Sequence, residues 1–87
     1  MASYRLVFKQ SVAKDLRGIP NEDVARILER IEMLAADPHP AGREKLSGQD
    51  RYRVRQGVYR IIYAIDNEEM VVLVVKIGHR RNVYRNK

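Results

Sequence analysis

The chain has 87 residues, a length that supports one hydrophobic core, and we expect residues 1–87 to form a single domain. Hydrophobic residues make up 45% of it and charged residues 32%, which excludes intrinsic disorder, while the absence of cysteine excludes disulfides and zinc-thiolate sites. The net charge of +6 favours a polyanionic partner, and no apolar run approaches the ~20 residues of a membrane-spanning helix, so we expect a cytoplasmic protein without membrane contact.

The first half of the chain predicts one strand and two helices. In residues 4–9, Tyr, Leu and Phe recur at every second position, the period of a strand with one buried face. A short helix is predicted over residues 11–17, where apolar side chains recur at helical spacing and Gly18 suits the C-terminal end. A longer amphipathic helix follows, capped by Asn21 and ended by the prolines of a loop over residues 37–49.

The second half predicts three strands that follow one another as a meander. They cover residues 52–55, 59–65 and 70–77, with turns at residues 56–57 and 66–69. The last strand opens on a continuous apolar run, as expected for a central strand covered on both faces. We therefore predict an α+β fold in the order βααβββ, in which a two-helix N-terminal hairpin packs on a small, mainly antiparallel four-stranded sheet.

Basic residues are concentrated in the second half. Residues 1–43 contain seven Lys/Arg and six Asp/Glu, net +1, whereas residues 44–87 contain ten and five, net +5. A surface for a polyanion is therefore predicted in the second half.

Three arginines are predicted to share one face of a hairpin. A symmetric turn centred on residues 56–57 pairs Arg53 with Arg60, and strand alternation adds Arg55 to the same face. Like charges placed across a strand pair repel each other, and a bound phosphate backbone would relieve this cost. The alternative is that all three are solvated positions on the outer face of the hairpin.

The segment after the last predicted strand combines arginines with a histidine and a tyrosine. Arg80 and Arg81 offer guanidinium groups to phosphate, and Tyr84 offers a stacking surface to an unpaired base. The alternatives are a frayed basic tail and, for His79, a packing role. The histidines and carboxylates lack the spacing of a metal site and the chain has no cofactor motif, so we expect neither a metal nor a cofactor.

Five short motifs follow one another along the chain. They are Leu-Ser-Gly at residues 46–48, Tyr-Arg-Val-Arg at residues 52–55, Gly-Val-Tyr-Arg-Ile-Ile-Tyr at residues 57–63, Ile-Gly-His-Arg at residues 77–80 and Val-Tyr at residues 83–84. Together with the βααβββ order, they resemble the RelE/ParE toxin superfamily over nearly the whole chain. The resemblance implies the toxin of a type II toxin-antitoxin system. Both mRNA endoribonucleases and DNA gyrase poisons use this scaffold, so the scaffold alone does not select the activity.

In the ribonuclease branch, the resemblance implies a metal-independent enzyme that cuts mRNA at the ribosome and so inhibits translation. A ribose 2′-hydroxyl is driven onto the adjacent phosphate. Arg60 would stabilise the pentacovalent phosphate, Arg80 would lie by the leaving 5′-oxygen and Tyr84 would orient a base. The predicted catalytic residues are Arg60, Arg80, Tyr84, Arg55 and His79. The predicted RNA-binding residues are Arg53, Arg55, Lys45, Arg51, Arg81 and Arg85.

The chain departs from the family pattern at the residues that would supply the general base. Relatives have lysines at the positions of Arg53 and Arg55, and an arginine keeps its proton where a lysine can lose it. His79 or Tyr84 would then act as the base, or the arginines would only bind and polarise the phosphate. Two rival functions stay open: a ParE-like DNA gyrase inhibitor and a noncatalytic RNA-binding module.

The resemblance also implies partners. A cognate RelB-like antitoxin is expected to cover the helices and the basic groove, and an acidic antitoxin would suit the charge. The toxin would further contact the ribosome and mRNA, and operator DNA only indirectly through the antitoxin complex.

Overall fold

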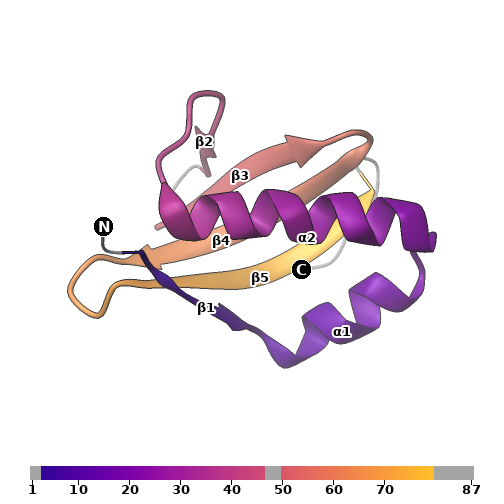
Figure 1. Ribbon diagram of the computed structural model, residues 1–87, viewed down its shortest axis with the longest axis horizontal. Coiled ribbons are helices and arrows are strands. Elements are labelled where there is room, and N and C mark those ends of the chain that lie inside the picture. The colour runs from indigo at the N-terminus through magenta and orange to yellow at the C-terminus, as the bar shows by residue number, and fades with distance from the viewer. Residues whose placement is uncertain (1–2, 47–49, 80–87) are drawn as a thin grey trace.

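Two helices on one face of a five-stranded mixed sheet make up the fold (Figure 1). The computed structural model describes residues 3–46 and 50–79 of the chain. The elements are, in chain order, β1 (Arg5–Phe8), α1 (Gln10–Arg17), α2 (Asn21–Ala36), β2 (Glu44–Lys45), β3 (Arg51–Gln56), β4 (Tyr59–Asp66) and β5 (Val71–His79). The strands lie side by side in the order β1-β5-β4-β3-β2, with β1 parallel to β5 and every other pair antiparallel.

The number of strands differs from the prediction, although the α+β class is confirmed. The sheet has five strands and not four, because a short strand, β2, lies within the predicted loop. Its two residues are too few to show an alternating pattern in the sequence. Pairing with β3 makes them a strand, with Glu44 opposite Arg53 and Lys45 opposite Tyr52.

The two helices lie on the same face of the sheet but do not match the predicted hairpin in detail. α1 packs mainly on β5, whereas α2 contacts β1, β3 and β5. In Figure 1, α2 lies in front of β3, β4 and β5. The pairing of β1 with β5 ends at Phe8 and Val74. Further along β5, the N–H of Ile77 donates to the Asp15 carboxylate of α1 at 3.1 Å, and this hydrogen bond joins the helix to the sheet. Asn21 is not the cap of α2 but its first helical residue, and Pro20 takes the N-cap position.

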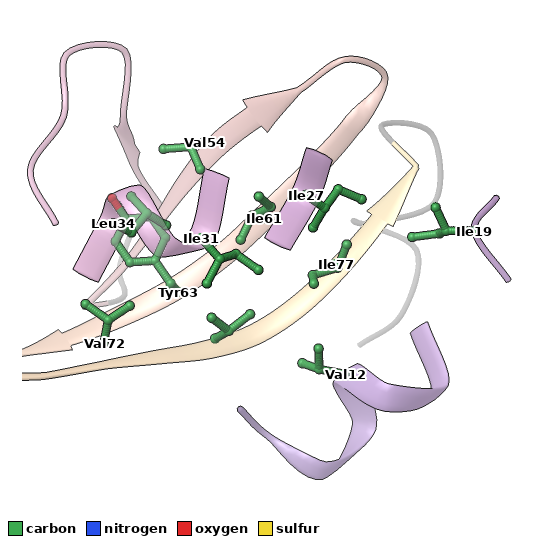
Figure 2. Packing of buried hydrophobic residues seen from close by; sticks show 11 residues of the cluster. Val12, Ile19, Ile27, Ile31, Leu34, Val54, Ile61, Tyr63, Val72 and Ile77 are labelled. Atoms are coloured by element: carbon green, nitrogen blue, oxygen red, sulfur yellow. The ribbon is translucent and has the colours of Figure 1, made fainter. Parts of the chain in front are cut away.

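The larger of two apolar clusters lies between the helices and the sheet. Ile27, Ile31 and Leu34 of α2 are spaced so that all three fall on one side of the helix, and all are fully buried. Figure 2 shows them meeting the inward-facing side chains of β3, β4 and β5. The cluster consists of Val12, Ile19, Ile27, Ile31, Leu34, Val54, Ile61, Tyr63, Val72, Val74 and Ile77.

A two-residue turn at Gly57 and Val58 sets the register of the β3–β4 hairpin. Gly57 has a φ of +61°, and tight hairpin turns place glycine at this first central position because it alone adopts such a φ without strain. Arg55 therefore pairs with Arg60. The predicted pairing of Arg53 with Arg60 is wrong by two residues, because the turn is centred one residue later than expected. A shift of two keeps every side chain on its face.

The predicted central strand is β5, which lies between β4 and β1. Val72 and Val74 are buried under the helices, whereas Val75 is buried on the opposite face with Ile62. An irregularity in the β4–β5 pairing at Ile62 leaves Val75 without a cross-strand partner. Burial on both sides explains the continuous apolar run.

Below, the helix face is the side of the sheet that α1 and α2 cover, and the open face is the other side.

Candidate nucleic-acid interface

Three arginines gather on the open face near the β3–β4 turn: Arg53, Arg55 and Arg60, below called the arginine cluster. Arg55 and Arg60 are direct cross-strand neighbours, and Arg53 stands two residues before Arg55 in β3. Val54, which stands between Arg53 and Arg55, and Ile61, which follows Arg60, are buried in the core of the helix face. Strand alternation therefore turns the arginines to the open face, and the prediction that all three share one face is confirmed.

The arrangement of the cluster suits a phosphate backbone. Arg55 and Arg60 stand directly opposite each other, and like charges in that position destabilise a strand pair unless an anion screens them. Guanidinium groups bind phosphate oxygens with paired hydrogen bonds in a fixed geometry. Several of them on one strand pair offer a surface on which a transferring or bridging phosphate can be held and its charge stabilised.

A carboxylate that sequence reasoning missed, that of Glu44, lies beside the arginine cluster. Its Oε1 accepts hydrogen bonds from Arg53, at 3.1 Å from Nε and 2.5 Å from Nη2. The hydrogen bond from Arg53 lowers the pKa of Glu44, and the charges of Arg53, Arg55 and Arg60 lower it further. Only the pairing of β2 with β3 brings Glu44 to this place, and a two-residue strand leaves no signal in the sequence.

Two predicted RNA-binding residues, Arg51 and Lys45, lie on different faces. Arg51 is two residues before Arg53 in β3, so it points to the open face and extends the basic surface. Lys45 pairs with Tyr52, whose side chain packs against the core of the helix face. The structure therefore groups Arg51, but not Lys45, with the arginine cluster.

His79, a predicted catalytic residue, lies on the opposite side of the sheet from the arginine cluster. It pairs with Tyr59, just as Gly78 pairs with Arg60. The two rings meet edge to face at 6.1 Å between centroids, and Tyr59 packs against the core of the helix face. His79 also lines a pocket beside Asp15 of α1. This placement does not bring the imidazole to the phosphate that the arginines would hold.

The remaining predicted site residues fall outside the described part of the chain. They are Arg80, Tyr84, Arg81 and Arg85. Within residues 3–46 and 50–79, no three His, Asp or Glu side chains lie close enough together to hold a metal ion. Neither α1 nor α2 is long and apolar enough to cross a membrane.

Comparison with known proteins gives matches over almost the full length. Residues 6–84 match the family model of the ParE toxin of type II toxin-antitoxin systems, parDE. RelE1 of Methanocaldococcus jannaschii is 30% identical, covering 95% of this chain and 97% of that protein. Toxin RelG of Mycobacterium tuberculosis is also 30% identical, covering 94% and 97%.

Solved structures with the same fold include chains of two toxin-antitoxin complexes. One is the RelBE2 complex from Mycobacterium tuberculosis, with a TM-score of 0.81 at 26% identity, covering 92% of this chain and 94% of that one. The other is the archaeal RelE–RelB complex from Pyrococcus horikoshii, with a TM-score of 0.76 at 30% identity, covering 88% and 94%.

Proposed function

This chain belongs to the RelE/ParE toxin superfamily, whose members are toxins of type II toxin-antitoxin systems, and from that premise we propose that it is a metal-independent mRNA endoribonuclease. It acts in the cytoplasm on mRNA that is being translated at the ribosome, and so inhibits translation. The observation that carries the proposal is the arginine cluster, which presents Arg53, Arg55 and Arg60 on the open face of the sheet.

In the proposed reaction, the ribose 2′-hydroxyl attacks the adjacent phosphate and the bond to the 5′-oxygen breaks. Negative charge grows on the phosphate oxygens in the transition state, and positioned cations stabilise it there. We assign this role to Arg60 and Arg55, and their position as cross-strand neighbours supports the assignment. We assign the leaving 5′-oxygen to Arg80 and the stacking of a base to Tyr84, because of their type and their place after β5.

The alternative function is that of a ParE-like gyrase inhibitor. The matching family model is described by the name ParE, which favours this reading. The RelE1 and RelG names of two relatives that match over nearly their full length favour the ribonuclease. A cluster of arginines that can bind phosphate also suits RNA cleavage, whereas an inhibitor that binds only protein does not require such a cluster.

We further infer that a RelB-like antitoxin keeps the toxin silent, as the complexes of the similar structures are named for RelB and RelE. An apolar groove between β1, α1 and α2 supports such a partner. Phe8 is 42% exposed and Leu28 38% exposed, and Val12 and Leu16 line the groove beside them. An amphipathic antitoxin with acidic residues would fill the groove and complement the net charge. Operator DNA is contacted only through that antitoxin.

The experiment that tests the activity is brief induced expression in bacteria, with primer extension on a reporter mRNA and a parallel assay for gyrase-linked DNA breaks. The wild type is expected to give discrete cuts within translated codons. The double variant Arg60→Ala, Arg80→Ala should reduce them by at least about 10²-fold, because it removes stabilising charge from the transition state. Arg26→Ala, at an exposed position of α2, is the matched control.

Other outcomes of this assay would support one of the two rival functions. Intact mRNA with accumulating DNA breaks would transfer the chain to the gyrase branch. Binding of RNA with neither mRNA cuts nor DNA breaks would support the noncatalytic RNA-binding module.

A further inference from the structure

A polar cavity of about 350 Å³ lies at the edge of the sheet, beside the part of β5 that β1 does not reach. The pairing of β1 with β5 ends at Val74, whereas β5 continues to His79. The walls of the cavity come from α1 and the loop after it, from the start of β4 and from the end of β5. Its volume is in the range of small-ligand sites, and it is called the edge cavity below.

Two residues of β5 connect the edge cavity with the arginine cluster, because they line the cavity and stand in the rows of the cluster. Lys76 pairs with Ile62, which is the cross-strand partner of Arg53. Gly78 pairs with Arg60. Since glycine has no side chain, β5 presents only backbone beside Arg60, and neighbouring strands lie about 5 Å apart. An RNA strand that is bound to the arginines can therefore continue over Gly78 to the cavity.

The charged pair in the edge cavity suits a nucleotide. Asp15 Oδ2 accepts a hydrogen bond from the Ile77 N–H at 3.1 Å, while Oδ1 lies 4.0 Å from the Lys76 ammonium. That separation is longer than a hydrogen bond, so Oδ1 can accept one from a ligand and the ammonium can donate one. The side chains of Asp15 and Lys76 are only 19% and 24% exposed, so hydrogen bonds made here are shielded from water.

The carboxylate and two aromatic side chains favour a base over a phosphate inside the cavity. A carboxylate repels phosphate, whereas every RNA base has an N–H on its Watson–Crick edge that can donate to it. Tyr59 and His79 meet edge to face at 6.1 Å between ring centroids, and both line the cavity. Aromatic rings bind unpaired bases of any type by stacking. The ammonium of Lys76 suits the phosphate of the same nucleotide.

We propose that the edge cavity is a nucleotide subsite that holds the base of a nucleotide flanking the cleaved bond. Asp15 accepts a hydrogen bond from the Watson–Crick edge of this base, and Lys76 binds its phosphate. This inference rests on the proposed ribonuclease function and adds to it a second base site, distinct from the stacking assigned to Tyr84. The subsite makes the cleavage rate depend on the codon position that it serves.

The test compares intact and abasic codons on programmed ribosomes, with subsaturating full-length toxin and cleavage rate as the readout. An abasic nucleotide is placed in turn at each position of the codon. At the position that the edge cavity serves, removal of the base should lower the wild-type rate about 10-fold or more, because the stacking and hydrogen bonds of that base are lost.

Two variants alter the cavity in different ways. Asp15→Asn keeps an oxygen acceptor for the Ile77 N–H but places an amide NH₂ where the base would donate. Gly18→Leu adds a side chain to the cavity wall, at a φ of −88° that any residue adopts. In either variant, the rate on the intact codon should fall about 10-fold, and removal of the base at the served position should then lower it less than about twofold further.

Two further variants are controls. Lys76→Gln should lower the rates on intact and abasic codons by the same factor, because its contact is with phosphate. Glu32→Gln, at an exposed site of α2, makes the same change in net charge as Asp15→Asn and should behave as wild type.

Different results would overturn different claims. If base removal at every position lowers the rates of Asp15→Asn and Gly18→Leu by the same factor as the wild-type rate, the edge cavity holds no base, while the ribonuclease stands. A wild-type protein that cuts no intact codon on the ribosome would remove both claims. Thermal melting identifies a variant that does not fold, and the other variant then decides by the same criterion.

Discussion

At the scale of single residues, one hydroxyl joins the loop after α2 to the sheet. Tyr63 is fully buried, and its hydroxyl donates to the carbonyl oxygen of Pro38 at 2.9 Å. Tyr52 packs beside it with ring centroids 5.9 Å apart, but the Tyr52 hydroxyl makes no hydrogen bond to the described part of the chain. The two tyrosines therefore form a matched pair for mutation.

Tyr63→Phe should destabilise the protein by about 1–2 kcal/mol, because it leaves the buried Pro38 carbonyl without its donor. Tyr52→Phe should change stability by less than about 0.5 kcal/mol, since it removes a hydroxyl without such a partner. Urea unfolding at neutral pH measures both. Equal losses in the two variants would contradict the role assigned to the Tyr63 hydroxyl.

Tyr63 should also make stability depend on pH in the alkaline range. Burial raises the pKa of Tyr63 from 10 to about 12. The unfolded chain thus loses this proton at lower pH than the folded one, so the stabilisation is fully present below pH 10 and is lost as the pH rises towards 12. The loss should amount to about 2 kcal/mol, and it should be absent from the curve of stability against pH for Tyr63→Phe. Parallel curves for the two proteins would refute it.

Residue types and strand alternation were enough to predict that the arginine cluster shares one face. The register differs from the prediction by two residues, and a shift of two leaves each side chain on the same face. The same reasoning did not find Glu44 or the position of His79. Glu44 reaches the cluster through a strand of two residues, whose formation depends on β3 and not on any pattern of its own. Gly78 pairs with Arg60 and so stands on the open face. His79 is the next residue of β5, and strand alternation turns its side chain to the helix face.

At the scale of elements, the β3–β4 hairpin determines which arginines stand opposite each other. Its register depends on Gly57, whose φ of +61° is disfavoured for residues with a Cβ. No neighbouring atom would obstruct a methyl group there, so any cost of substitution comes from the backbone alone. Gly18, which ends α1 with a φ of −88°, has no such requirement.

Gly57→Ala should therefore destabilise the protein by about 1–2 kcal/mol, the cost of holding an L-residue at positive φ. Gly18→Ala should be neutral or slightly stabilising, because alanine restricts the unfolded chain and its Cβ would meet nothing closer than 3.9 Å. Thermal unfolding of the two variants gives the comparison. A stabilised Gly57→Ala would mean that the hairpin does not need this turn.

The elements themselves were predictable where their pattern is long. α2 and the three strands of the second half appear with ends shifted by a residue or two, since amphipathic spacing and apolar runs mark them. The placement of α1 on β5 was not predictable, because its contacts join residues far apart in the chain, such as the hydrogen bond from the Ile77 N–H to the Asp15 carboxylate. The predicted register of the β3–β4 hairpin was wrong because a tight turn can be centred one residue earlier or later, and the sequence pattern does not distinguish these positions.

At the scale of the whole molecule, the arginines of β3 and β4 form a basic surface on one side of the sheet. α1 and α2 cover one face of the sheet (Figure 1). By strand alternation, the arginine cluster and Arg51 lie on the other face. Cations on such a surface release counterions from RNA when they contact phosphates, and this makes binding weaken as salt rises. The members of the cluster should not contribute equally, because Glu44 already neutralises Arg53.

For single-stranded RNA, each phosphate contact adds about 0.7 to the slope of log K against log salt concentration. Arg55→Gln should therefore reduce the slope by about 0.7, while Arg53→Gln should reduce it by clearly less, since RNA must first compete with the Glu44 carboxylate for that guanidinium. Arg26→Gln, on the helix side, should leave the slope unchanged. Fluorescence anisotropy of a labelled oligonucleotide over a salt series measures all three. If Arg26→Gln lowers the slope as much as Arg55→Gln, the positive charge acts as a diffuse field over the whole molecule, and the open face has no privileged role in holding RNA.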